Sequence, residues 1–299
     1  MKQAIGYGIL ASLFFAVTFI LNRSMNAAGD SYLWSAALRY LFMLPFLFLI
    51  VYRRRQTTQV YRAIKNEPAA WLLWSSVGFG LFYLPLTFAA NYGESWLIAG
   101  LWQCTIVAGI LLSPLWGVRI PGKNLAIAAF ILIGVFVLQM EKAAGENMGQ
   151  NYLYILAVLV AAVAYPLGNR KMMLLCRDEL NTTQRVFGMT LCSMPFWLLT
   201  AGAALLQSGL FSWSQAMQSL IVALFSGVVA TLLFFKATTM VMHNAKKLAV
   251  IEATQAGEVV FSLLGGCLLL GDALPTTLGC IGLLVIVIGM LANSLTTAS

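Results

Sequence analysis

Charged residues are scarce in this chain of 299 residues: Asp, Glu, Lys and Arg make up only 9% of it. A soluble globular domain carries roughly 25%, and no hydrophilic stretch here is long enough to fold as a separate soluble domain. Hydrophobic residues account for 61% of the chain. The composition therefore predicts an all-α protein that lies almost entirely within a lipid bilayer.

Motifs for several kinds of chemistry are also missing. The chain has one histidine, and it lacks an HExxH or GxSxG motif, a phosphate-binding loop and any paired metal-ligand spacing. None of the five cysteines forms a CxxC pair, so we interpret them as small buried hydrophobic residues rather than as disulfides or zinc ligands. We expect neither an enzyme nor a bound cofactor, and no ATP-driven pumping by this chain alone.

What the sequence does contain is a series of apolar runs, each about 20 residues long, the length that a helix needs to cross the hydrocarbon core. The first has no small-residue cleavage pattern after it and is interpreted as a retained span rather than a signal peptide. Ten runs are predicted to span the membrane, at 4–25, 33–52, 70–91, 96–117, 123–141, 152–172, 185–206, 216–242, 248–270 and 275–294.

Lys and Arg gather in alternate connections, which indicates orientation because basic loops stay on the cytoplasmic side. Fourteen of the 18 basic residues fall on one predicted side: Lys2, Arg53, Arg54, Arg55, Arg62, Lys65, Arg119, Lys123, Arg170, Lys171, Arg177, Arg185, Lys246 and Lys247. This distribution predicts both termini in the cytoplasm and a place in the plasma membrane. It also explains the net charge of +8 without nucleic acid as a partner.

An internal repeat divides the chain into halves. GILASLFFAVTFILNRSM (8–25) resembles YILAVLVAAVAYPLGNRKM (154–172), and MLPF (43–46) resembles SMPF (193–196). We therefore predict two copies of one five-helix unit, at 1–146 and 147–299. Five is an odd number, so the second copy must be inverted in the membrane, an arrangement typical of transporters with a site at the repeat interface.

The stretch VIEATQAGEVVFSLLGG (250–266) carries the polar residues that matter most. On a helix, Glu252, Gln255, Glu258 and Ser262 fall within an arc of roughly 120°, and such a stripe is expected to face the bundle interior or a water-filled cavity. Glu258 lies roughly 15 Å inside the span, half the thickness of the hydrocarbon core. We predict that it carries protons or meets a cationic group; a protonated structural carboxyl is the alternative.

Glu252 lies only about four residues inside the same span, where a helix start or interfacial water could accommodate it. Lys236 lies at a similar depth in the preceding span, so an ion pair with Glu252 at a cytoplasmic gate is predicted, with snorkelling of Lys236 to the interface as the alternative. Arg39 lies about six residues from the outer end of its span and is expected to snorkel or to form a structural pair.

Substrate contacts are predicted at positions that the repeat relates or that carry aromatic rings. Gln103 falls opposite Gln255 in the alignment of the two halves, and both are expected to hydrogen-bond the substrate. Trp102, beside Gln103, and Tyr83 in the third run are the aromatic candidates for stacking on a flat or cationic molecule. Gly279, Gly282 and Gly289 give the last run a small-residue face that could pack against another helix, so a homodimer is left open.

Ten runs in two inverted halves, the NR repeat and the stretch 250–266, which leads to a Gly271–Asp272 turn, together resemble the drug/metabolite transporter superfamily. The closest resemblance is to its branch of multidrug-resistance efflux transporters. This resemblance implies a central cavity formed by the first, third, fourth, sixth, eighth and ninth spans, with the fifth and tenth peripheral. The small relatives in this superfamily carry their essential Glu in the first helix, where LASLFFAVTFIL has no acid, so that role does not transfer by position.

The resulting hypothesis is a secondary transporter that exports a small organic molecule by alternating access, coupled to protons. The alternatives are an importer or exchanger of a metabolite such as an amino acid or nucleoside, or a lipid flippase. A membrane assembly subunit outside transport is a more distant alternative. The identity of the substrate, the direction of transport and the coupling ion do not follow from the sequence.

Overall fold

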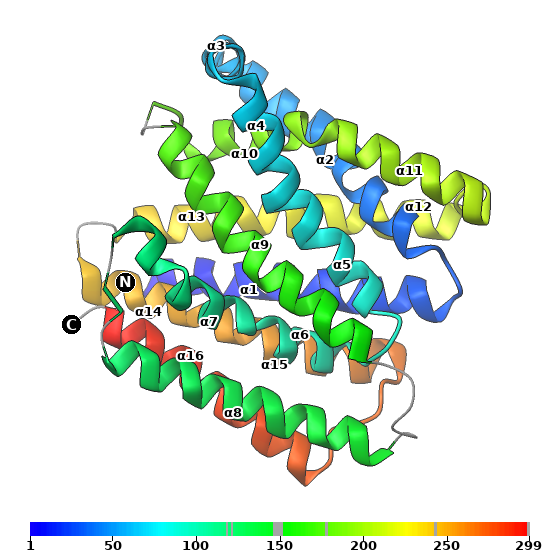
Figure 1. Cartoon of the computed structure of the whole chain (residues 1–299), viewed down its shortest axis with the longest axis vertical. Coiled ribbons are helices and arrows are strands. Elements are labelled where there is room, and N and C mark those ends of the chain that lie inside the picture. Colours follow the sequence, from blue (N-terminus) through cyan, green and yellow to red (C-terminus); the bar gives the residue numbers. More distant parts are fainter. Residues whose placement is uncertain (118, 121, 146–151, 177–178, 242–243, 298–299) are drawn as a thin grey trace.

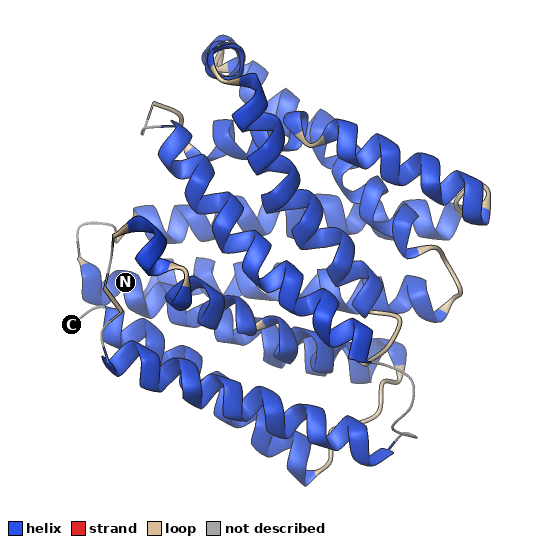
Figure 2. Cartoon of the chain, in the orientation of Figure 1, coloured by secondary structure: helices blue, strands red, loops and turns tan. Residues whose placement is uncertain are grey.

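The computed structural model confirms an all-helical protein. It describes residues 1–117, 119–120, 122–145, 152–176, 179–241 and 244–297, and within these ranges no β-strand forms (Figure 2). Eight of the described helical stretches are long and apolar enough to cross a membrane, or nine if the pair bent by 45° at residue 193 is one span. The predicted run 96–117 holds a shorter apolar stretch, Ser95–Leu111, so the count of ten spans stays a prediction.

The first half of the chain contains the elements that correspond to the first five predicted runs. Several of them are interrupted by a turn of tighter or wider helix (η). They are α1 Lys2–Ala27, α2 Tyr32–Arg53, α3 Thr57–Asn66, α4 Pro68–Ser75, η1 Ser76–Gly80, α5 Leu81–Ala89, α6 Ser95–Trp102, α7 Cys104–Leu111, η2 Ser113–Trp116 and α8 Gly122–Gly145. The short helix α3 lies outside the predicted runs and was missed because it is polar on one side.

The second half is also built from long and interrupted helices. They are α9 Tyr152–Cys176, α10 Thr182–Cys192, α11 Met194–Ser208, α12 Trp213–Ile221, η3 Val222–Ala230, α13 Thr231–Thr239, α14 Ala245–Ala253, η4 Thr254–Ala256, α15 Gly257–Gly265, η5 Gly266–Leu270 and α16 Thr277–Thr297. The start of α1 and the end of α16 lie at the same end of the bundle, called the terminal end here; the opposite end is called the far end (Figure 1).

Contacts between helices follow a reciprocal pattern. In the first half α1 packs against η3, α13 and α15 of the second half, while α9, its predicted counterpart, packs against α5, η1 and α7 of the first. Likewise α2 packs against α11, and α8 packs along α16. Two copies of one unit would produce this pattern. The predicted boundary between 146 and 147 lies outside the described residues, and the division into repeats stays a prediction.

The small-residue face of α16 is occupied by α8 of the same chain. A Cβ atom added to Gly282 would lie 2.9 Å from the backbone nitrogen of Leu138 and 3.0 Å from the carbonyl oxygen of Gly134. Added Cβ atoms at Gly279 and Gly289 would meet Glu141 and Ile131. The glycines therefore let two helices of one chain approach closely, as such motifs do in membranes, and this face is not available to a second copy.

Candidate functional site

A cavity of about 440 Å³ lies between the two halves, within the range of 300–1,000 Å³ that small-molecule sites occupy. Its walls come from α1, η1, α5, α6, α7, α9, η3, α13, α14 and α15, as the family resemblance implies, and also from α2, α10 and α16. The expectation that the tenth span is peripheral is therefore incomplete, because the C-terminal part of α16 reaches the cavity. No residue of α8 lines it.

Five of the seven predicted site residues line this cavity: Glu258, Glu252, Gln255, Gln103 and Trp102. They come from the fourth and ninth predicted runs, which the repeat pairs with each other. Ser262, the fourth member of the predicted stripe, does not line the cavity; it is completely buried, and its hydroxyl has no hydrogen-bond partner. Three of the four residues of the predicted stripe therefore face the cavity, and Ser262 does not.

Two predicted residues lie elsewhere. Tyr83 does not line the cavity; it is fully buried, and its hydroxyl donates to Oδ1 of Asn22 at 3.1 Å. Lys236 is exposed, and its ammonium donates to the hydroxyl of Tyr7 at 2.9 Å. Among the described residues Lys236 makes no ion pair with Glu252. The expected contact is absent because Tyr7, on the neighbouring helix α1, already provides Lys236 with an oxygen acceptor and an aromatic face 4.3 Å away.

Glu258 is half-buried because its side chain faces the cavity. The turn η4 interrupts the helix just before it, so that Glu258 lies in the first turn of α15 rather than in the middle of one continuous helix. Gln103 lines the same cavity as Glu258, and its amide nitrogen donates to the carbonyl of Ala99 at 3.0 Å. The amide nitrogen of Gln255 is buried and has no partner. An amide with an unused donor at a cavity wall can hydrogen-bond an incoming ligand.

Arg39 is the main residue that sequence reasoning misplaced. It is only 7% exposed and lines the cavity instead of snorkelling to the surface. Its terminal nitrogens Nη1 and Nη2 donate to the hydroxyls of Thr18 at 3.1 Å and Ser226 at 3.3 Å. The guanidinium carbon lies 4.1 Å from the centre of the Tyr83 ring, and the buried Nε has no hydrogen-bond partner.

Aromatic rings form another part of the wall. The ring of Phe82 lies 5.0 Å from Trp102 and 4.8 Å from Tyr165, centre to centre, and the last two are 5.6 Å apart. Trp102 is only 7% exposed, whereas Tyr165 is 39% exposed, so the cluster buries the indole and leaves the ring of Tyr165 accessible. Trp102 lies at the cavity wall, as predicted. From the sequence, Phe82 and Tyr165 could not be distinguished from the many other aromatic residues of the spans.

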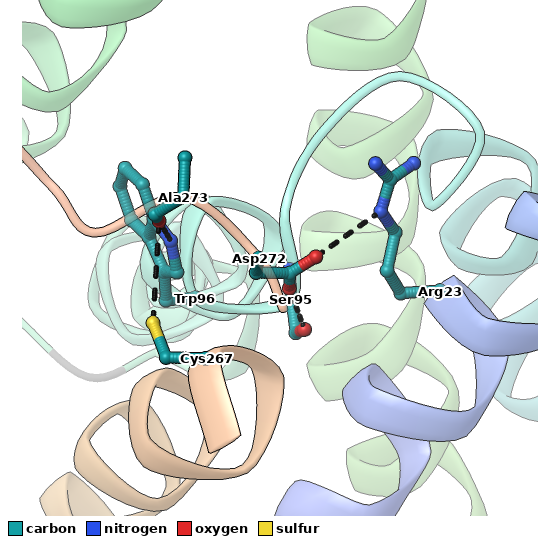
Figure 3. A network of polar contacts seen from close by, with 6 residues as sticks. All are labelled: Arg23, Ser95, Trp96, Cys267, Asp272 and Ala273. Atoms are coloured by element: carbon teal, nitrogen blue, oxygen red, sulfur yellow. Dashed lines mark hydrogen bonds and ion pairs between the residues drawn. The ribbon is translucent and has the colours of Figure 1, made fainter. Parts of the chain in front are cut away.

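A network of polar contacts joins the helices at the far end of the bundle (Figure 3). Asp272 accepts hydrogen bonds from the backbone nitrogen of Ser95 at 3.0 Å and from its hydroxyl at 2.5 Å. Its other oxygen lies 3.6 Å from Nε of Arg23, and the indole of Trp96 donates to the carbonyl of Ala273 at 3.0 Å. These contacts tie α1, the start of α6 and the turn before α16 together.

The turn at Gly271–Asp272 was predicted, and its backbone geometry explains why residue 271 is a glycine. Gly271 has a φ angle of +70°, in the left-handed region that glycine adopts without steric cost. The chain reverses there, so that Asp272 points back toward the start of α6. Nothing in the sequence signalled the partners of Asp272, because Arg23 lies near the other end of the chain.

The cavity and the network lie on opposite sides of the bundle centre. Lining residues include Glu252, in the last turn of the short helix α14, and Asn293 and Ser294, near the end of α16, so the cavity extends toward the terminal end. At the far end the network joins the helices. The cavity wall presents two acids, Glu252 and Glu258, and two guanidinium groups, those of Arg39 and Arg185. A ligand inside it would meet these charges and an aromatic wall.

Comparison with known proteins places these features in a family. A family model described as "EmrE: Putative multidrug resistance efflux transporter" matches residues 2–299. The chain is 50% identical over 305 residues to "Uncharacterized protein YjlA" of Bacillus subtilis (strain 168), and the match covers 98% of this chain and 94% of that protein.

Two further similarities extend the comparison. The chain is 46% identical over 269 residues to "Uncharacterized 42.1 kDa protein in intracellular alkaline protease 3'region" of Shouchella clausii, with 86% of this chain and 70% of that protein covered. A solved crystal structure matches with a TM-score of 0.66 over 99% of this chain and 98% of that one. At 16% identity this last match shows a shared fold alone.

Proposed function

Because the chain belongs to the family of putative multidrug resistance efflux transporters, we propose that this multi-pass membrane protein exports a small organic molecule in exchange for protons. The observation that carries the proposal is the position of Glu258, an acid on the wall of a cavity between the two halves of the chain. An ionisable group inside a membrane bundle is costly, and it is typically retained for a relay or a substrate contact.

In the proposed cycle, proton and substrate compete for Glu258. When Glu258 is ionised it attracts the substrate; when it is protonated the substrate leaves, and an inward proton gradient then drives export. Gln103 and Gln255 orient the bound molecule through their amide groups. Glu252, which is exposed and lies nearer the terminal end, provides the route by which protons and substrate reach the cavity.

Alternating access requires the closed end to open. We assign the terminal end to the cytoplasm of a cell with the protein in its plasma membrane, so that the cavity faces inward and the Asp272 network faces outward. Rocking of one five-helix half against the other would separate Arg23 and Ser95 from Asp272 and expose the cavity to the outside. The described structure then corresponds to the inward-facing state of the cycle.

The test is proton-dependent flux in liposomes reconstituted with the wild type and with Glu258→Gln. A glutamine keeps the size and hydrogen bonding of the side chain but removes its titration, so we expect flux to become independent of the proton gradient. Glu67→Gln is the matched control, since it changes an exposed acid that does not line the cavity and is expected to retain the coupling. Unchanged proton-dependent flux in Glu258→Gln would remove Glu258 from the mechanism.

A further inference from the structure

The cavity contains a buried cation that the proposed proton cycle does not use. Arg39 is more than nine-tenths buried and lines the cavity, and it forms no ion pair with any carboxylate in the part of the chain that the structure describes. Its neighbours are the neutral hydroxyls of Thr18 and Ser226 and the face of Tyr83. A buried charge without an opposite charge is costly, so its retention at the cavity wall requires an explanation.

The surroundings of Arg39 fix its orientation and leave donors unused. A guanidinium has five N–H groups, and the hydrogen bonds to Thr18 and Ser226 use one on Nη1 and one on Nη2. Nε is buried without a partner. The hydroxyl of Thr18 also donates to that of Ser226 at 2.6 Å, so the two hydroxyls form a fixed support on which the guanidinium rests. This is the fork geometry that binds carboxylates with two parallel hydrogen bonds.

Glu258 provides the opposite charge in the same cavity. It interacts with Arg39 electrostatically but is not in ion-pair contact with it, so the two charges face a shared space that neither fills. The remaining wall near them is largely aromatic and apolar. Arg185 also lines the cavity, but Arg39 is the deeply buried guanidinium held by Thr18 and Ser226. The one positive charge of Arg39 matches the charge of a carboxylate better than that of a doubly charged phosphate.

We infer that Arg39 binds the carboxylate of the substrate, and that the transported molecule carries a carboxylate and an amine on a small apolar body. The amine meets Glu258, and the body lies against the aromatic wall. This inference rests on the proposed function, because it takes the cavity as the transport site. It narrows the substrate class from any small organic molecule to amphoteric ones, and it disfavours purely cationic lipophilic compounds.

Three probes with the same phenyl body separate the contributions of the two charges: phenylalanine, which carries both groups, 3-phenylpropionate, which carries only the acid, and 3-phenylpropylamine, which carries only the amine. Binding to the purified full-length protein is measured by calorimetry, and flux of each probe by counterflow in liposomes. For the wild type we expect phenylalanine to bind most tightly, by about tenfold or more over either probe that lacks one charge.

Two variants make the test reciprocal. Arg39→Gln is expected to weaken phenylalanine and 3-phenylpropionate by about tenfold or more while 3-phenylpropylamine keeps its affinity. Glu258→Gln is expected to weaken phenylalanine and 3-phenylpropylamine by a similar factor, while 3-phenylpropionate keeps its affinity. Arg39→Lys keeps the charge but loses the fork, so it should fall between the wild type and Arg39→Gln. Exposed Arg54 supplies the control, because Arg54→Gln should leave the ratios of the three affinities as they are in the wild type.

The outcomes test this inference separately from the proposed transport function on which it rests. Wild-type protein that binds and moves 3-phenylpropylamine at least as well as the two carboxylate probes would overturn the assignment of Arg39 and leave export intact, even if Arg39→Gln failed to fold. Wild-type protein that prefers the carboxylate probes, with no flux of any probe, would support the anion site and overturn the transport proposal.

Discussion

Arg23 and Arg39 occupy successive helices, α1 and α2, yet the chain treats their charges in opposite ways. The side chain of Arg23 is 27% exposed and has the carboxylate of Asp272 as its partner at 3.6 Å. Arg39 is more deeply buried, at 7%, and has only hydroxyls and an aromatic face. The residue with easier access to water has the counter-charge. Stability alone would favour a carboxylate partner for the more deeply buried arginine. We therefore interpret Arg23 as a structural residue and Arg39, as proposed above, as a residue that binds a ligand.

The largest expected effect follows from removing the carboxylate of the structural pair. Asp272→Ala leaves Arg23 without its partner and the backbone nitrogen of Ser95 without its acceptor. We expect it to destabilise the contacts at the far end by about 2–4 kcal/mol, the combined range of two hydrogen bonds to a carboxylate and one partly exposed ion pair. Labelling of a cysteine introduced at Ile106, on the cavity wall, by an impermeant maleimide added from outside should increase. The reference is Ile106→Cys with Asp272 intact. Equal labelling rates in the two proteins would show that the network does not hold the far end closed.

A smaller change tests one side-chain hydrogen bond within the same network. Ser95→Ala removes the hydroxyl that donates to Asp272 at 2.5 Å but keeps the backbone hydrogen bond and the ion pair. We expect a loss of about 1 kcal/mol, the usual net value of one hydrogen bond, measured as the free energy of unfolding in mild detergent. Ser214→Ala, at a residue of α12 outside the network, is the control. A loss as large as that of Asp272→Ala would contradict the view that the ion pair contributes separately.

The sequence predicted much of the architecture because hydropathy and charge are local signals. Each of the ten apolar runs corresponds to a helical stretch, and a turn lies at Gly271–Asp272 as predicted, with Gly271 in the left-handed region. Glu258, Gln255 and Gln103 were found from depth and from the repeat. These arguments work because the bilayer penalises a deep polar group wherever its helix lies, so such a group indicates a function before its neighbours are known.

The misplaced residues depend on contacts between distant parts of the chain. Arg39 was expected to snorkel because it lies close to a helix end, but α1 and η3 cover it with Thr18 and Ser226. Lys236 was expected to pair with Glu252, and Tyr7 of α1 meets it instead. In both cases the decisive neighbour is on α1. Distance from a helix end could not reveal which side of α1 faced which later helix.

Arg23→Gln probes the other member of the structural pair and should have a small effect. Because Arg23 is partly exposed, the pair contributes about 0.2–1 kcal/mol on the scale of solvent-accessible ion pairs. Salt screens such pairs, so the difference in melting temperature between wild type and variant should shrink as salt is added. Lys65→Gln, at a residue of α3 with no ion pair among those described, provides the baseline. A difference that does not respond to salt would indicate that Arg23 acts through packing rather than charge.

Arg39→Met should have the smallest effect on stability. This prediction tests whether Arg39, unlike Arg23, is dispensable for the folded structure. The variant removes a buried cation that has no carboxylate partner and replaces it with an apolar side chain of similar length; the hydroxyls of Thr18 and Ser226 keep their mutual hydrogen bond. The lost hydrogen bonds and the relieved desolvation cost oppose each other, so we expect a change within about 1 kcal/mol. Thermal unfolding of the empty protein measures it, and added 3-phenylpropionate should stabilise the wild type alone. If the empty variant were as unstable as Asp272→Ala, Arg39 would be a structural residue like Arg23, and the cavity would have no cation reserved for its ligand.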